Sequence, residues 1–163
     1  MALVPTGIKK IDRSQWLAYL DTTPDTENAT YAILGVGITE FAVAYNPQVD
    51  TEKWIIENTA RNDHTSNQKQ GSVSQKMYKG DPCFEFAHKA CDKLNYKTKI
   101  LEVDRWNGSD GSYPAKLSDG ILVVTQKGGD NAVLEYDLYF NGEPQEGTAT
   151  YTGDVPKFTA AVI

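Results

Sequence analysis

The sequence is poor in cysteine and has no long apolar run. Two cysteines in 163 residues are too few for a disulfide framework, so the chain is expected to fold without one. No stretch of about 18 apolar residues is present, so no transmembrane helix is expected. The start has no basic cluster followed by an apolar core, so no signal peptide is predicted. We therefore expect a protein made in a reducing cytoplasm, with no membrane partner.

Residue patterns typical of metal sites and active sites are also missing. Cys83 and Cys91 are eight positions apart, about 12 Å along a helix, which is too far for a disulfide within one intact helix. His88 shares a helix face with Cys91, but no CxxC or HxxxH motif accompanies them. Both would face the core, away from any substrate. The sequence therefore predicts no metal, no cofactor and no enzymatic activity.

Basic residues are not in excess. The net charge is −6, so the chain lacks the electrostatic footprint of a protein that grips DNA. The charge is uneven, because residues 58–79 have a local charge of +3 and residues 101–163 carry ten acids against four bases. Opposite charges on two parts of the surface allow one copy to attract another. The alternative interpretation is two solvated faces whose charges differ by chance.

Alternation of apolar and polar residues is the clearest pattern present. In residues 132–140, Ala132, Leu134, Tyr136, Leu138 and Phe140 share one face, and Val133, Glu135, Asp137 and Tyr139 share the other. This period of two predicts a strand with one buried side. Further strands are predicted at 31–37, 38–45, 52–58 and 97–106, with hairpin turns at 127–130 and 141–142.

A single helix is predicted at about residues 81–95. Asp81 suits the N-cap and Pro82 the first helical position. Phe84, His88 and Cys91 then recur at helical spacing. The predicted fold class is mainly β: an antiparallel β-sandwich or barrel with one flanking helix that covers a barrel mouth or a sheet face.

The segments outside these elements predict the domain organisation. Residues 1–30 have weak periodicity and are expected to form an N-terminal arm, while residues 31–163 form a single β domain. Residues 59–76 are almost wholly polar and are expected to form a long loop within that domain.

Several short segments of the sequence together resemble one protein family. The segments GDPCFEFAHKACDKL (80–94), KTKILEVDRWNG (97–108) and YFNGEPQEGTATYTGDVPKFT (139–159) resemble the major tail proteins of long-tailed bacteriophages and prophages. The resemblance covers about residues 50–160 and implies a virion subunit made in a bacterial host. In that family, six copies form a ring, and the rings stack with other tail proteins into a tube through which genomic DNA leaves. Within this resemblance, the residues of these segments favour a non-contractile tail.

Under this resemblance, two groups of residues are candidates for function. Glu135 and Asp137 would line the channel, repel DNA phosphates and let DNA pass without specific binding. The 59–76 loop would contact the next ring, with Arg61, Asp63, Lys69 and Lys76 as candidate residues. A chain lacking residues 62–74 is then expected to fold but not to build tubes.

Two other functions remain open from the sequence. A carbohydrate- or receptor-binding β module would need an exposed row of aromatic side chains; the candidates are Tyr31, Trp54, Trp106, Tyr113 and Tyr139. An enzyme would need a reactive Cys83 or Cys91.

Overall fold

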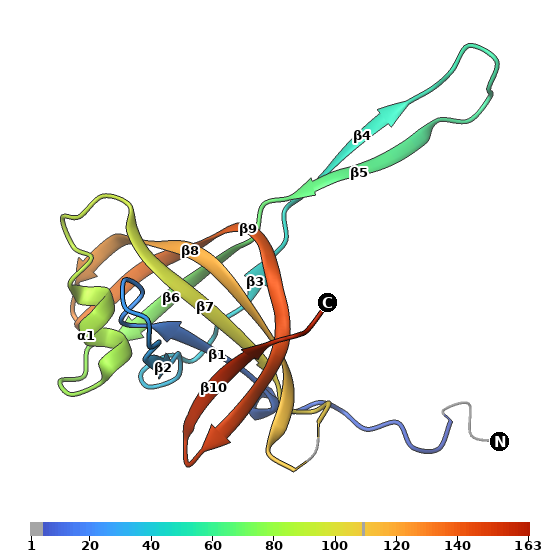
Figure 1. Cartoon of the computed structure of the whole chain (residues 1–163). Coiled ribbons are helices and arrows are strands. Elements are labelled where there is room, and N and C mark those ends of the chain that lie inside the picture. The colour runs from blue at the N-terminus through green and yellow to red at the C-terminus, as the bar shows by residue number, and fades with distance from the viewer. Residues whose placement is uncertain (1–4, 109) are drawn as a thin grey trace.

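The computed structural model describes residues 5–108 and 110–163 and has a mainly antiparallel β fold with one α-helix among these residues (Figure 1). The predicted fold class is confirmed. An eight-stranded sheet has the order β2-β1-β7-β8-β9-β6-β3, with β10 paired to β9, and a separate two-stranded sheet joins β4 and β5. The strands are β1 (Trp16–Asp21), β2 (Tyr31–Ile33), β3 (Val43–Ala44), β4 (Pro47–Glu52), β5 (Arg61–Asn67), β6 (Gln70–Lys76), β7 (Tyr96–Asp104), β8 (Ser112–Gly128), β9 (Val133–Thr152) and β10 (Val155–Ala160). A 3-10 turn, η1 (Arg13–Gln15), precedes β1.

The large sheet curls around one apolar core. Its two edge strands, β2 and β3, are consecutive in the chain, and an isolated bridge from Ile38 to Gln75 ties the segment between them to β6. Leu20, Ile100, Leu134 and Leu138 are fully buried inside. Each alternates along its strand with residues that face outward, as the pleat requires.

A second cluster lies on the outer face of β1 and β7. Tyr19, Leu101 and Val103 are buried there, one position away from the residues that face the first core. Phe158 of β10 packs against this cluster. The outer face is therefore covered by the C-terminal part of β9 together with β10.

The predicted hairpin turn at Asn141–Gly142 is wrong. Strand β9 continues through it to Thr152, and Ser118 of β8 faces the extra residues 142–144 in a bulge. Gly142 has φ of 71°, which a bulge accommodates as readily as a turn does. The chain reverses instead at Gly153 and Asp154, between β9 and β10.

Helix α1 (Pro82–His88) is shorter than predicted. Asp81 is its N-cap and accepts a hydrogen bond from the backbone N–H of Cys83, and Pro82 occupies the first turn. Asp92 and Asn95 have positive φ, which a helix does not allow, so the helix cannot extend to residue 95 as expected. Cys83, Phe86 and Ala87 pack into the first core, so α1 closes one end of the curled sheet (Figure 1).

The expected N-terminal arm holds a central strand. Strand β1 lies between β2 and β7, and its Leu20 is fully buried. Residues 5–12 are exposed and contain no strand, while residues 1–4 of the predicted arm lie outside the described residues. The strand was missed because it is only six residues long and buried on both faces, so it has no alternation to detect.

The predicted strand at 52–58 and the long loop at 59–76 are also wrong. The chain forms the β4–β5 hairpin, whose tip is residues 53–60, and then β6 of the large sheet. Both hairpin strands are exposed along their whole length, so they have no apolar face to mark them as strands. Strand β6 does alternate, with Val73 and Gln75 buried.

Candidate assembly surfaces

The β4–β5 hairpin projects far from the rest of the molecule (Figure 1). Its strands pair with each other from Pro47–Asn67 to Glu52–Arg61 and with no other strand of the described chain. An isolated two-stranded hairpin is at best marginally stable in water. Its order therefore depends on interactions among its own side chains.

Side chains at the hairpin tip hold one another in place. The indole Nε1–H of Trp54 donates to Oε1 of Glu52 at 2.8 Å, and the Arg61 guanidinium lies 4.1 Å from the centre of the Trp54 ring. Arg61 also forms an ion pair with Glu57. Between these residues, Ile55 and Ile56 are almost completely exposed. The tip thus presents two aliphatic side chains on an ordered support, which is typical of an interaction site.

The four candidate residues for contact with the next ring do not lie together. Arg61 and Asp63 are on β5 of the hairpin, Lys69 follows β5 at the base, and Lys76 ends β6 in the large sheet. The hairpin itself, residues 47–67, carries two bases against four acids, a formal charge of −2. The local charge of +3 over residues 58–79 is therefore absent from the hairpin, because Lys69, Lys76 and Lys79 all belong to the body.

Lys69 is half-buried in an ion pair rather than free for a partner. Its Nζ lies 3.6 Å from Oε2 of Glu102 on β7 and 4.6 Å from the centre of the Phe140 ring. Burial raises the pKa of the Glu102 carboxyl, and the nearby Lys69 opposes that shift. The pair ties the hairpin base to the wall of the curled sheet.

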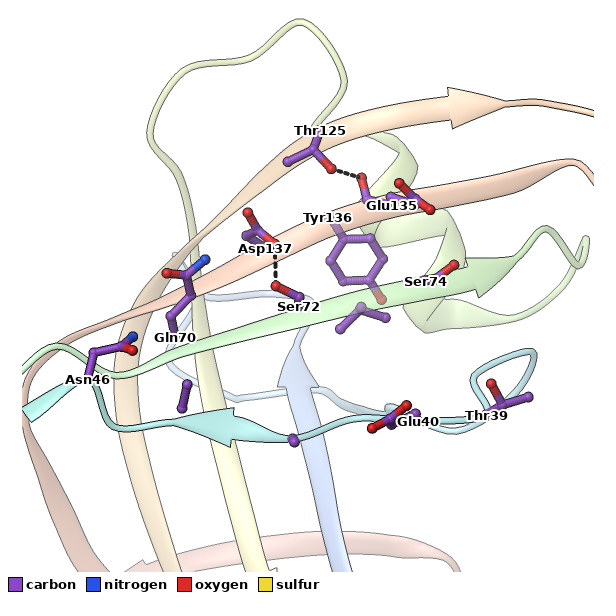
Figure 2. Close-up of a pocket in the computed structure, with 13 residues that line it drawn as sticks. Thr39, Glu40, Asn46, Gln70, Ser72, Ser74, Thr125, Glu135, Tyr136 and Asp137 are labelled. Atoms are coloured by element: carbon purple, nitrogen blue, oxygen red, sulfur yellow. Dashed lines mark hydrogen bonds between the residues drawn. The ribbon is translucent and has the colours of Figure 1, made fainter.

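Glu135 and Asp137 lie side by side on the outward face of β9, beside a hollow of about 770 Å³ (Figure 2). Oδ1 of Asp137 accepts a hydrogen bond from Oγ of Ser72 at 2.8 Å. Glu40, on the far wall, adds a third carboxylate. The hollow is polar and acidic, so it would repel phosphates.

A buried polar network includes Cys83 and Asp81, the N-cap of α1. The side-chain N–H₂ of the fully buried Gln75 donates to Oδ2 of Asp81 at 2.7 Å, and its Oε1 accepts from the hydroxyl of Tyr136 at 2.8 Å. Cys83 lies 3.7 Å from the same hydroxyl. Burial raises the pKa of the Cys83 thiol to about 12, so the thiol stays protonated and unreactive at neutral pH.

The remaining residues considered as nucleophiles or metal ligands are Cys91 and His88, whose backbones are joined by a hydrogen bond. Cys91 is a free, half-buried thiol, and the Nε2 of His88 lies 2.7 Å from Nζ of Lys127. Within residues 5–108 and 110–163, no group of three or more His, Cys, Asp and Glu side chains could hold a metal ion.

The aromatic residues proposed for a sugar platform do not form a row. Tyr31 and Tyr113 pack against the second cluster, whereas Trp54 is at the hairpin tip and Tyr139 is on β9. Trp106 is in the turn after β7. The sequence does contain a pattern that marks the hairpin tip. Trp54, Ile55 and Ile56 are three consecutive apolar residues between polar neighbours, a pattern that also resembles a short strand.

No protein-family model matches the chain, and a comparison with curated proteins found no match. Among the described residues, no helix has the length and apolarity needed to cross a bilayer.

Proposed function

We propose that this protein is a structural subunit of a phage tail tube, which assembles with copies of itself into stacked rings around a channel for DNA. The observation that carries the proposal is the projecting β4–β5 hairpin, whose ordered tip exposes Ile55 and Ile56. These exposed side chains do not stabilise a single chain, whereas burial against a neighbouring copy would be favourable. The resemblance of three sequence segments to major tail proteins supports the same function and implies rings of six.

Unpaired strand edges also support assembly. Strand β10 pairs only with β9, and β2 only with β1, within the described chain. Along an edge strand, alternate residues direct their backbone N–H and C=O groups toward the partner strand and away from it. The N–H of Ala161 donates to the carbonyl of Glu146 on β9, so the backbone groups of Phe158 and Ala160 face outward. These groups can pair with a neighbouring copy, and a closed ring would satisfy all such edges.

The acidic hollow supports a channel role. Glu135 and Asp137 would line the channel and repel the phosphates of passing DNA, so DNA would slide without being bound. Their place inside a channel is part of this proposal.

The hairpin tip offers the sharpest test of assembly. Replacing both Ile55 and Ile56 by Ser removes about 1.5–3 kcal/mol of burial energy per side chain at each contact. We expect the concentration at which the protein polymerises, measured by light scattering, to rise at least about tenfold. Leu94→Ser is the control, because Leu94 is equally exposed but lies in the loop after α1. Unchanged polymerisation of the double variant would contradict a role for the tip.

A further inference from the structure

A pocket of about 520 Å³ lies on the outer face of β1, and we call it the tyrosine pocket. Its lining includes Leu17, Tyr19, Ile33, Arg105, Tyr113 and Tyr151. Tyr19 is almost fully buried, and its hydroxyl lies 2.9 Å from that of Tyr151. The lining is thus mainly aliphatic and aromatic, with one cation, Arg105, and one acid, Asp154, and the size of the pocket is typical of binding sites.

Arg105 is held in place but has no acidic partner among the described residues. Its guanidinium lies 5.5 Å from the centre of the Tyr113 ring and 5.1 Å from that of Tyr151. No ion pair joins it to an acid of the described chain, although Asp154 is on the rim. A guanidinium has five N–H donors in a fixed plane that fits a carboxylate. Arg105 can therefore receive an acidic side chain from outside.

The hairpin tip has complementary features. Ile55 and Ile56 match the apolar floor of the pocket, and Glu57 follows them directly. Oε1 of Glu57 is paired with Arg61 of the same tip, and Oε2 is a buried oxygen without a hydrogen-bond partner among the described residues, so Glu57 must turn outward to reach a donor of another copy. The tip therefore combines two aliphatic side chains with a carboxylate whose hydrogen bonding is incomplete.

The tip and the pocket lie on opposite sides of the molecule. The hairpin projects from one side of the body, whereas the turn between β7 and β8 and the turn between β9 and β10, which border the pocket, lie on the other (Figure 1). A contact between the tip of one copy and the pocket of the next joins two different surfaces. Such a head-to-tail contact either closes into a ring or repeats along an axis, and surfaces on opposite sides favour the repeat that builds a stack.

We propose that the tyrosine pocket of one copy receives the hairpin tip of the next, with Ile55 and Ile56 on its floor and the Glu57 carboxylate on Arg105. This inference rests on the proposed function and adds the acceptor site to it. A rival acceptor, a pocket of about 390 Å³, lies at the base of the hairpin and is lined by Trp16, Phe41 and Tyr45. Its lining also includes Glu102 and Asp104 against a single Lys116, so it suits a Glu-bearing tip less well.

Directed cross-linking tests the contact. All variants carry Cys91→Ser, while the buried Cys83 is retained. Protein with Ile55→Cys at the tip is mixed with protein with Ile33→Cys in the pocket wall and oxidised with copper–phenanthroline. The matched control replaces Ile33→Cys by Val123→Cys on β8, because both side chains are 39% exposed. Tyr45→Cys reports on the rival pocket.

The yield of disulfide-linked dimer, together with tube formation, decides whether the contact exists. We expect at least about tenfold more disulfide-linked dimer with Ile33→Cys than with Val123→Cys. If tubes form but the tip cross-links equally to Val123→Cys, or better to Tyr45→Cys, the inference is overturned while the proposed function stands. If neither assembly nor cross-linking above the control occurs, both are overturned.

A second variant tests the charge contact without cysteines. Arg105→Glu should raise the polymerising concentration at least about tenfold, because it places like charges together. Arg105→Lys should restore part of the loss, since the positive charge is kept. Circular dichroism confirms that each variant is folded. Normal polymerisation of a folded Arg105→Glu variant would overturn the contact.

Discussion

At the residue scale, the molecule depends on buried polar groups that satisfy one another. Gln75 is fully buried on β6, yet its side chain bonds to the carbonyl of Val36, to Asp81 and to Tyr136. These bonds join the helix cap, β9 and the segment that closes the sheet. A buried network of this kind is costly to break, because each lost partner leaves a desolvated group unsatisfied.

Tyr136→Phe should test this network. The change removes the hydroxyl that donates to Gln75 and leaves the buried Oε1 without that bond. We expect the free energy of unfolding in urea to fall by about 1–3 kcal/mol. Tyr139→Phe on the same strand is the control, because the hydroxyl of Tyr139 is exposed. Its removal should change the free energy of unfolding by less than about 0.5 kcal/mol. Equal effects of the two substitutions would count against the network.

The Glu102–Lys69 pair predicts a pH dependence. Burial raises the pKa of Glu102 above its ordinary value of 4.5, so the folded state binds more protons than the unfolded state just above that pH. This group's contribution to stability is therefore full below pH 4.5 and is lost as the pH rises through the raised pKa. The cause is that desolvation of the carboxylate outweighs its attraction to Lys69.

Glu102→Gln should consequently match the unmodified protein in acid and exceed it at neutral pH. Glutamine resembles the protonated carboxyl in shape and never acquires the buried charge. Urea unfolding of both proteins on each side of pH 4.5 measures the difference. A variant less stable at neutral pH would mean that the Lys69 attraction is the larger effect.

At the element scale, the pattern of burial decides which elements the sequence predicts. The alternation of residues 132–140 marks β9 correctly, since Leu134, Tyr136 and Leu138 are buried. Strands without one apolar and one polar face cannot be found in this way: β1 is buried on both faces and the β4–β5 hairpin is exposed on both. Among the candidate site residues, the neighbouring positions of Glu135 and Asp137 follow from period two, whereas the burial of Lys69 depends on the distant Glu102.

The boundaries of the hairpin change what a deletion should do. Removing residues 62–74, which seems harmless if 59–76 is a loop, would delete most of β6 and the buried Val73, so that variant is expected not to fold. Replacing residues 48–66 by Asn-Gly instead joins Pro47 to its partner Asn67 through a two-residue turn.

The 48–66 replacement should leave a folded body that no longer forms tubes. The hairpin pairs only with itself in the described chain, so its loss removes little from either apolar cluster. We expect a circular dichroism spectrum and a cooperative thermal transition close to those of the unmodified protein, with no polymer. Loss of the cooperative transition would show that the hairpin supports the body.

At the scale of the whole molecule, the described chain leaves several groups without partners. Among the described residues, the apolar tip is exposed, the Arg105 guanidinium has no acidic partner, and the outward backbone groups of β10 pair with no strand. The tip and the tyrosine pocket lie on opposite sides, which suits the proposed stacking, while β2 and β10 have edges that could pair with neighbours in the proposed ring. Copies of one chain can satisfy all of these groups together.

Negative-stain electron microscopy of the purified, unmodified protein over a range of concentrations tests self-assembly most directly. Our account predicts hollow tubes of stacked rings above a threshold concentration. Single particles at every concentration, with neither rings nor tubes, would contradict it.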